Sequence, residues 1–231
     1  GDDPAARSAC AEVMRAFFTA GGRLIDSSPM YGSSQGVIGE GLARIGRAGD
    51  VFSAEKVWIG AGGRGPAQIE ASRRLWRVPR FDLLQVHNLL AWEEHLPQLQ
   101  AMKAAGRVRY IGITTSEGRR HRDIEAVMRD HALDFVQVTY NPVDREVEQR
   151  ILPLARERGV AVLANRPFQE GALLQRLVRR HAVPLLATAG AAPVLGIQAV
   201  TEVTVFDAIV CTSAGVTALQ MDIKVEGITA E

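Results

Sequence analysis

Four ionisable side chains stand at or just beyond the ends of three short apolar runs. The run RLID ends at Asp26, a turn containing Pro29 leads on to Tyr31, VFSAEK ends at Lys56 and DLLQVH ends at His87. A phenol has a pKa near ~10, so it is a poor acid at neutral pH. A neighbouring cation lowers that pKa, and a carboxylate beside the cation holds the ammonium in place. We therefore expect Asp26 and Lys56 to tune Tyr31 as a proton donor.

The histidine at the end of the third run extends this chemistry. His87 could hydrogen-bond the oxygen that receives the proton and so orient a carbonyl group. Because no side chain supplies hydride, reduction of that carbonyl would need a redox cofactor. Each of the four residues alone is explained as readily by a turn or a solvated strand end. Four of them on three successive strand ends favour a shared site.

The elements that would position these residues recur along the chain. Between the apolar runs lie amphipathic stretches that could cover a sheet, and the period of about 25 to 30 residues is typical of a strand plus a crossover helix. The runs are almost continuously apolar, which indicates strands buried on both faces. The expected strands are 23–26, 51–56, 82–87, 109–114, 134–140 and 160–165, and the expected helices between them are 34–45, 66–76, 93–105, 121–131 and 144–158.

Repeated strand–helix units suit either an open doubly wound sheet or a closed (β/α)8 barrel. No Gly-rich phosphate loop of the dinucleotide-binding type follows any of the runs, which favours the barrel. All strands of such a barrel point the same way, so their polar ends gather on the rim where active sites are built. The residues expected on that rim are Asp26, Lys56, His87, Thr114, Gln137 and Asn165.

Composition narrows the function classes. The 231 residues carry a formal net charge of +1 without an unopposed basic cluster, which argues against a nucleic-acid surface. Cys10 and Cys211 lie far apart without metal-type spacing, so we expect no metal site, a reducing compartment and hence the cytoplasm. The sequence shows no membrane-spanning run or signal peptide, and a leader preceding the first residue stays an open alternative. The oligomeric state is not readable from these residues.

Several of these stretches resemble a known family. GGRLIDSSPMYGSSQGVIGEGL, the Lys of VFSAEKVW, and DLLQVHN followed by GRVRYIGIT are similar to the aldo-keto reductases, above all the bacterial ones, over residues 5 to about 176. The resemblance implies a TIM (β/α)8 barrel that uses NADPH to reduce a small aldehyde or ketone. It also implies that Asp26, Tyr31, Lys56 and His87 form the family's tetrad, with Tyr31 as the acid.

The resemblance also implies which residues would hold the cofactor. The family binds the nicotinamide amide with polar residues after its fifth strand and a Gln on its sixth, which fall on Thr114, Thr115 and Gln137. An aromatic residue after the seventh strand commonly stacks on the nicotinamide ring. Asn165 or Arg166 would have to cover the ring here, the latter with its guanidinium face.

Both ends of the chain depart from the family pattern. We expect an incomplete barrel over residues 1–177, with the first strand and the last strand–helix unit missing or replaced, followed by an atypical segment, 178–231. Residues 195–200 or 202–210 could substitute for a strand, or the segment could add a hairpin to the open barrel edge. Residues 213–229 resemble a stretch of polynucleotide phosphorylase. That family's metal-binding carboxylate motif is absent upstream, so Asp222 and Lys224 receive no catalytic role.

Two other function classes stay open. The missing strands favour a non-catalytic barrel remnant that binds or interacts without holding a cofactor. A strand-end lysine beside a tyrosine is also how Schiff-base lyases are built, with Lys56 as the nucleophile. Asp26 and the family resemblance speak against the lyase.

Overall fold

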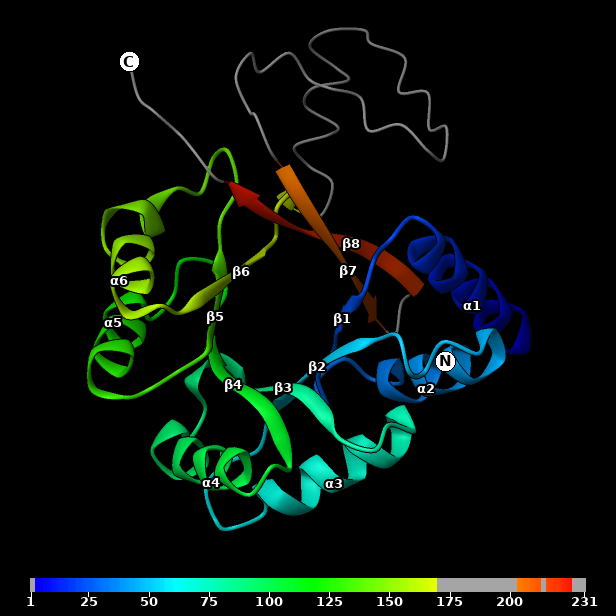
Figure 1. The fold of residues 1–231 in the computed structure, drawn as a ribbon, viewed down its shortest axis with the longest axis horizontal. Helices are drawn as coiled ribbons and strands as arrows, with labels where there is room; N and C mark the ends of the chain where they lie inside the picture. The colour runs from blue at the N-terminus through cyan, green and yellow to red at the C-terminus, as the bar shows by residue number, and fades with distance from the viewer. Residues whose placement is uncertain (1–2, 170–202, 213–214, 226–231) are drawn as a thin grey trace, which may run out of the picture.

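Six parallel strands form one curled sheet in chain order, with the helices on its outer side (Figure 1). The computed structural model describes residues 3–169 with their side chains, and the backbone of residues 203–212 and 215–225. The strands are β1 (Leu24–Asp26), β2 (Phe52–Val57), β3 (Phe81–Val86), β4 (Val108–Thr114), β5 (Phe135–Thr139) and β6 (Ala161–Asn165). Each bound lies within one residue of its expected place. The predicted fold class, an incomplete (β/α) barrel, is confirmed.

The helices alternate with these strands. In the described residues no helix is long and apolar enough to span a membrane. The α-helices are α1 (Pro4–Thr19), α2 (Ser34–Ile45), α3 (Gly65–Trp76), α4 (Trp92–Ala104), α5 (His121–Asp130) and α6 (Ile151–Arg158), and the 3-10 turns are η1 (His87–Leu89) and η2 (Glu146–Gln149).

Two local predictions were wrong. His87 does not end β3 but opens η1, which turns the chain away from the sheet. The single helix expected over 144–158 is split into η2 and α6 at Arg150. Pro153 explains the split, because it has no N–H to bond the carbonyl of Gln149, so a helix can begin at Ile151 but not run through that point.

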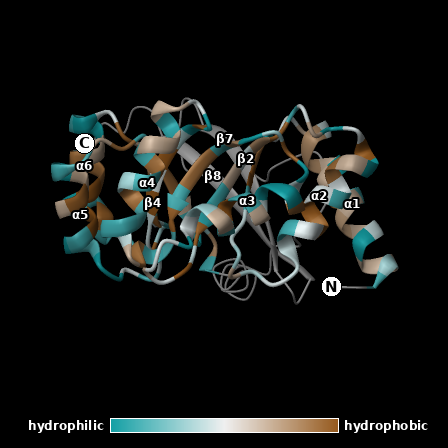
Figure 2. Cartoon of the chain, turned by 90° about the horizontal axis from the view of Figure 1, so that it is seen from below, coloured by the Kyte–Doolittle hydropathy of each residue, from teal (hydrophilic) through white to brown (hydrophobic). Residues whose placement is uncertain are grey.

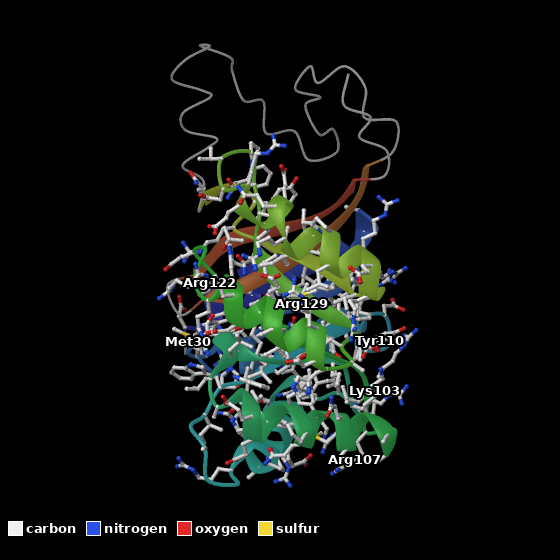
Figure 3. All side chains as sticks on the ribbon, turned by 90° about the vertical axis from the view of Figure 1, so that its left-hand side faces the viewer. Met30, Lys103, Arg107, Tyr110, Arg122 and Arg129 are labelled. Carbon is white, nitrogen blue, oxygen red and sulfur yellow. The ribbon has the colours of Figure 1, made fainter. Side chains whose placement is uncertain are left out.

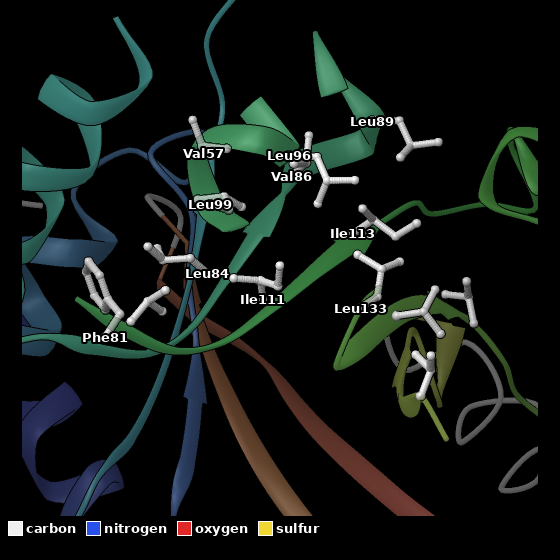
Figure 4. Packing of buried hydrophobic residues seen from close by; sticks show 14 of the residues in the cluster. Val57, Phe81, Leu84, Val86, Leu89, Leu96, Leu99, Ile111, Ile113 and Leu133 are labelled. Carbon is white, nitrogen blue, oxygen red and sulfur yellow. The ribbon is translucent and has the colours of Figure 1, made fainter. Parts of the chain in front are cut away.

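The main core lies between the sheet and its helices. Figure 4 shows strand residues such as Leu84, Ile111 and Ile113 packed against Leu96 and Leu99 of α4, all of them buried. In Figure 2 the brown hydrophobic colour gathers on the strands and the helix sides that face them, while the outward sides of α5 and α6 are largely teal. Burial of this layer fixes the sheet's curvature and so the positions of the strand ends.

The inner face of the sheet changes from apolar to polar along each strand. Leu24, Ala54, Leu83 and Leu163 form a small buried cluster, against which Phe52, Tyr110 and Phe135 pack. Two residues further along the same strands stand Asp26, Lys56, Gln85 and Asn165. Since residues i and i+2 of a strand share a face, these polar groups lie one layer above an apolar floor. Figure 3 places Tyr110, in that floor, and Met30, beyond β1, at opposite ends of the molecule.

Helices α2 and α3 approach each other closely at one glycine. A Cβ added to Gly39 of α2 would lie 2.0 Å from the carbonyl oxygen of Leu75 in α3. Only the absence of a side chain permits this backbone contact. The glycine therefore sets the distance between two helices that both carry buried polar residues toward β2.

A two-stranded antiparallel hairpin follows the barrel. Strands β7 (Val203–Thr212) and β8 (Gly215–Val225) pair with each other, and they lie near β1 and β6, respectively (Figure 1). A hairpin was among the expectations, but no hydrogen-bonded ladder joins either strand to the edge of the parallel sheet in the described part of the chain. Residues 195–200 and the proposed boundary at 177 lie outside the described residues, as do 213–214 and 226–229 of the stretch resembling polynucleotide phosphorylase.

Candidate active site

Strand β1 ends shortly before a proline, which has no backbone N–H to continue the hydrogen-bonded ladder with β2. Ser27 N–H still bonds the carbonyl of Ala54 at 3.0 Å. The next donor in the register would be residue 29, and Pro29 has no N–H. The chain instead makes a turn in which Tyr31 N–H bonds the carbonyl of Ser28 at 2.9 Å. The turn thus carries Tyr31 back over the end of the sheet.

Asp26 and Lys56 form a buried ion pair across neighbouring strands. Both residues are 1% exposed, and the Lys56 ammonium contacts Asp26 Oδ2 directly. The ammonium also donates to the Ser27 carbonyl at 2.9 Å, and Gln85 Nε2 lies 3.3 Å from the other Asp26 oxygen. Burial lowers the pKa of Lys56, but Asp26 and the Tyr31 phenol more than offset this, so the pKa lies above its usual value. The lysine is therefore a fixed cation.

Tyr31 lies beside this cation. The Lys56 Nζ is 5.1 Å from the centroid of the phenol ring. Burial raises the pKa of Tyr31; Lys56 lowers it, as expected, but not enough to reverse the effect of burial. The predicted net lowering was therefore wrong, because desolvation of the phenolate outweighs the attraction of the ammonium. At neutral pH Tyr31 carries its proton.

His87 packs edge-to-face against Tyr31, with ring centroids 5.7 Å apart and an interplanar angle of 81°. Its pKa is lowered to about 3, first by burial and then by the Lys56 charge, so the imidazole is neutral. His87 Nδ1 lies 2.7 Å from the hydroxyl of Ser28, a buried residue to which the sequence assigned no role. The four predicted residues are thus brought together, and a fifth joins them.

Glu55 is a second residue that sequence reasoning missed. Its side chain faces away from Lys56, toward α2 and α3, and is 0% exposed. Glu55 Oε1 accepts the backbone N–H of Lys56 at 2.8 Å, while Oε2 accepts from Gln35 at 2.8 Å and Trp76 at 2.7 Å. Burial raises the pKa of this carboxyl to about 7. An acidic residue inside an apolar strand was the available signal, because such a group needs partners.

The residues predicted to hold a cofactor lie along the carboxyl ends of β4 to β6. Thr114, Thr115 and Gln137 are buried, and Gln137 Nε2 has no hydrogen-bond partner among residues 3–169. The amide of Asn165 bonds the carbonyl of Thr115 at 2.8 Å and its oxygen accepts from Thr139 at 2.6 Å. The guanidinium of Arg166 bonds Glu117 at 2.6 Å. The structure places all five at the predicted rim, and Gln137 is the one whose buried side-chain nitrogen has no partner in the described part of the chain.

The segment after His87 is conformationally strained. Asn88, Leu89 and Ala91 have φ values of 54°, 53° and 48°, in the left-handed region that non-glycine residues seldom adopt. Three hydrogen bonds hold the segment to the end of β4 and to Arg120, just before α5. Asn88 N–H bonds Thr114 Oγ1 at 3.1 Å, and Arg120 bonds the carbonyls of Asn88 and Leu89 at 3.1 and 3.0 Å. Residues outside the segment, Thr114 and Arg120, thus help to hold its backbone in the strained conformation.

Comparison with known proteins identifies the family. The model of the "Aldo/keto reductase family" matches residues 1–187. The chain belongs to the aldo/keto reductase family. The family resemblance noted in the sequence is thereby confirmed, and Asp26, Tyr31, Lys56 and His87 all lie within the matched region.

Curated relatives match with modest identity. An aldo-keto reductase of Strobilurus tenacellus is 29% identical over 174 residues, which are 70% of this chain and 51% of that protein. A methylglyoxal reductase of Escherichia coli is 26% identical over 189 residues, 79% of this chain and 66% of that protein. The chain thus spans about half to two thirds of the length of these relatives.

Solved structures show the same fold. An aldo/keto reductase from Klebsiella pneumoniae, in complex with NADP and acetate, has a TM-score of 0.67 and 21% identity, covering 79% of this chain and 66% of that one. The holo form of an aldo-keto reductase from Bacillus halodurans has a TM-score of 0.63 and 23% identity, covering 74% and 60%. At these identities the likeness shows the fold alone.

Proposed function

We propose that this site reduces a small aldehyde or ketone to an alcohol with NADPH. The observation that carries the proposal is the contact set around Tyr31. A protonated phenol stands beside a fixed ammonium, and a neutral imidazole packs against the same ring. A carbonyl oxygen near both rings would meet one proton donor and one hydrogen-bonding group.

The roles follow from the charges of these groups. Tyr31 gives its proton to the developing alkoxide, and the Lys56 ammonium stabilises the phenolate that remains. Asp26 holds that ammonium in place through the buried ion pair. His87, being neutral, orients the carbonyl through a hydrogen bond rather than through charge.

The cofactor that the family implies fits residues of this chain. In the described part of the chain, the buried donor Gln137 Nε2 has no partner, which suits the carbonyl oxygen of a carboxamide. Thr114, whose hydroxyl accepts from Asn88, keeps its own proton for a second contact. The nicotinamide would supply the hydride when bound. Asn165 and Arg166 are proposed to line the same side of the site.

The rim above the tetrad is apolar. Met30, Trp58 and Leu90 follow β1, β2 and β3 and are 50%, 38% and 37% exposed. They would cover a hydrophobic substituent of the carbonyl compound and exclude water from it. A methylglyoxal reductase among the relatives acts on a small carbonyl compound, which supports this substrate class.

The same contacts bear on the two other function classes. A Schiff-base lyase needs a lysine that loses its proton readily. Lys56 is paired with Asp26 and its pKa is raised, so the lyase is disfavoured. The non-catalytic remnant differs from the reductase only in cofactor binding, which makes that the property to measure.

A fluorescence titration of the purified chain with NADPH and with NADH tests the proposal. We expect saturable binding of NADPH, followed by aldehyde-dependent loss of its absorbance. Absence of binding up to about 1 mM cofactor, a binding free energy of about −4 kcal/mol, would leave the non-catalytic barrel as the better description. A covalent adduct trapped by borohydride at Lys56 would favour the lyase.

A further inference from the structure

One buried contact at the site has no part in the chemistry above. The hydroxyl of Ser28 lies 2.7 Å from His87 Nδ1, and Ser28 is 0% exposed. The two residues are 59 positions apart in the sequence and meet only because the turn after β1 folds over the end of β3. Ser28 sits in the same turn as Tyr31, whose N–H bonds the Ser28 carbonyl.

The direction of this hydrogen bond follows from the other contact of the hydroxyl. Ser28 Oγ accepts the backbone N–H of Met30 at 3.1 Å. Among the described residues no other acceptor lies within reach of the hydroxyl proton. If His87 donated from Nδ1, Ser28 would keep a buried proton without an acceptor, which costs about 1–3 kcal/mol. Satisfying both groups requires Ser28 to donate and His87 Nδ1 to accept.

The state of the imidazole then determines where its own proton lies. Burial and the Lys56 charge lower the pKa of His87 to about 3, so the ring holds a single proton at neutral pH. With Nδ1 accepting, that proton is on Nε2. His87 Nε2 makes no hydrogen bond to the described part of the chain, so it stays available to a ligand.

We propose that Ser28 is a positioning residue that fixes His87 as the Nε2–H tautomer, so that His87 presents a donor beside the Tyr31 hydroxyl. The assignment of the tautomer rests on the contacts of Ser28 with His87 and Met30 and on the neutral state of the imidazole, and not on the proposed function. Its role in carbonyl reduction rests on the proposed function. Two donors then converge on one oxygen, one giving its proton and the other keeping it.

The tautomer can be read without any turnover. The full chain is labelled with 15N at histidine, and long-range 1H–15N spectra at about pH 7 distinguish the two neutral tautomers. His87→Gln identifies the resonance. We expect the Nε2–H form in the unmodified protein. An Nδ1–H form would overturn the proposal without the need for a variant at Ser28.

Variants at the serines separate this role from packing. Ser28→Ala should lower the ratio of Nε2–H to Nδ1–H about fivefold, the equivalent of one neutral hydrogen bond. Ser28→Thr keeps the hydroxyl and should keep the tautomer. Ser27→Ala is the matched control, because Ser27 Oγ bonds Ser34 at 2.6 Å and not His87. An unchanged spectrum in Ser28→Ala, or an equal shift in Ser27→Ala, would refute the assignment.

The catalytic arm uses the same variants with NADPH and an aldehyde. Ser28→Ala should lower kcat/KM in proportion to the Nε2–H population that it removes, by less than about fivefold, while the Kd of NADPH is unchanged, and Ser28→Thr should restore kcat/KM. A shifted tautomer with unchanged kcat/KM would overturn the positioning role. If the unmodified chain does not oxidise NADPH, the proposed function fails, whereas the tautomer result still decides what Ser28 does to His87.

Discussion

The carbonyl oxygen of Ser27 accepts a hydrogen bond from the side-chain Nζ of Lys56 at 2.9 Å, where a continued ladder would give it the backbone N–H of Lys56. Pro29 ends the ladder, and the displaced N–H is taken by Glu55 Oε1 at 2.8 Å. The Glu55 carboxylate thus accepts the backbone N–H that the carbonyl of Ser27 would accept in a continued ladder, and the Lys56 side chain reaches Asp26 from this point. Backbone and side chain of Lys56 are held by different partners.

Glu55→Gln should change how stability depends on pH. The pKa of Glu55 is raised from 4.5 to about 7 by burial, so the folded state binds this proton more tightly than the unfolded state. Its contribution to stability is present below the unfolded pKa and is lost as pH rises from about 4.5 to about 7. The loss is on the order of 3 kcal/mol.

Urea unfolding of both proteins at about pH 5 and about pH 8 checks this. The variant loses a hydrogen-bond acceptor, so we expect it to have the lower free energy of unfolding at about pH 5. The difference in free energy of unfolding between the two proteins should narrow or reverse at about pH 8. Comparing the two proteins removes the opposite contribution of His87, whose lowered pKa makes stability fall at acid pH. Parallel pH profiles would contradict the buried, titrating carboxyl.

Asp26→Asn should destabilise the fold by about 3–5 kcal/mol, because it leaves the Lys56 ammonium buried without its counter-charge. The double variant Asp26→Asn with Lys56→Met should recover part of this loss. Lys103→Met is the control, since Lys103 pairs with Asp134 at the surface and such pairs are worth about 1 kcal/mol or less. If Asp26→Asn lowers the free energy of unfolding by no more than Lys103→Met does, the ion pair between Asp26 and Lys56 is not desolvated.

Tyr31→Phe should remove the proton donor and leave the surrounding packing intact. On the proposed function, we expect kcat to fall by about 10² to 10⁴ with NADPH binding preserved. Because burial raises the pKa of Tyr31, the acid form persists through alkaline pH. The kcat of the unmodified enzyme should therefore show no loss of this acid from about pH 7 to about pH 9. Retained turnover in the variant would remove Tyr31 from its role.

Arg120→Met should loosen the strained segment after His87. Arg120 bonds the carbonyls of Asn88 and Leu89, and without it the left-handed residues lose an external support. We expect amide hydrogen exchange in the segment to accelerate about tenfold, with global unfolding little changed. Arg122→Met is the matched control. Arg122 is an exposed arginine two residues further along the chain, and its replacement should leave hydrogen exchange in the segment unchanged.

The sequence predicted the strand ends well because their geometry is local. Parallel strands in chain order place successive carboxyl ends side by side, so Asp26, Lys56 and His87 had to be neighbours once the six runs were recognised. The turn to Tyr31 was also readable, since Pro29 cannot continue a ladder. These inferences need only residue order and backbone rules.

What was missed depends on burial. The direction of the Tyr31 pKa shift required knowing how much water the turn excludes, and no spacing contains that information. Ser28 received no role because its partner, His87, is remote in sequence. Glu55 faces the helices, and only packing shows that Gln35 and Trp76 meet its carboxylate.

The backbone contact at Gly39 links these remote parts. It fixes the spacing of α2 and α3, which supply Gln35 and Trp76 to Glu55, and Glu55 in turn holds the peptide of Lys56. In a screen of random variants, loss-of-function changes should therefore include substitutions of Gly39, a buried helix residue outside the candidate active site. The positions of such changes would identify the residues that hold Lys56 indirectly, from Glu55 to Gln35 and Trp76 and then to the contact between α2 and α3.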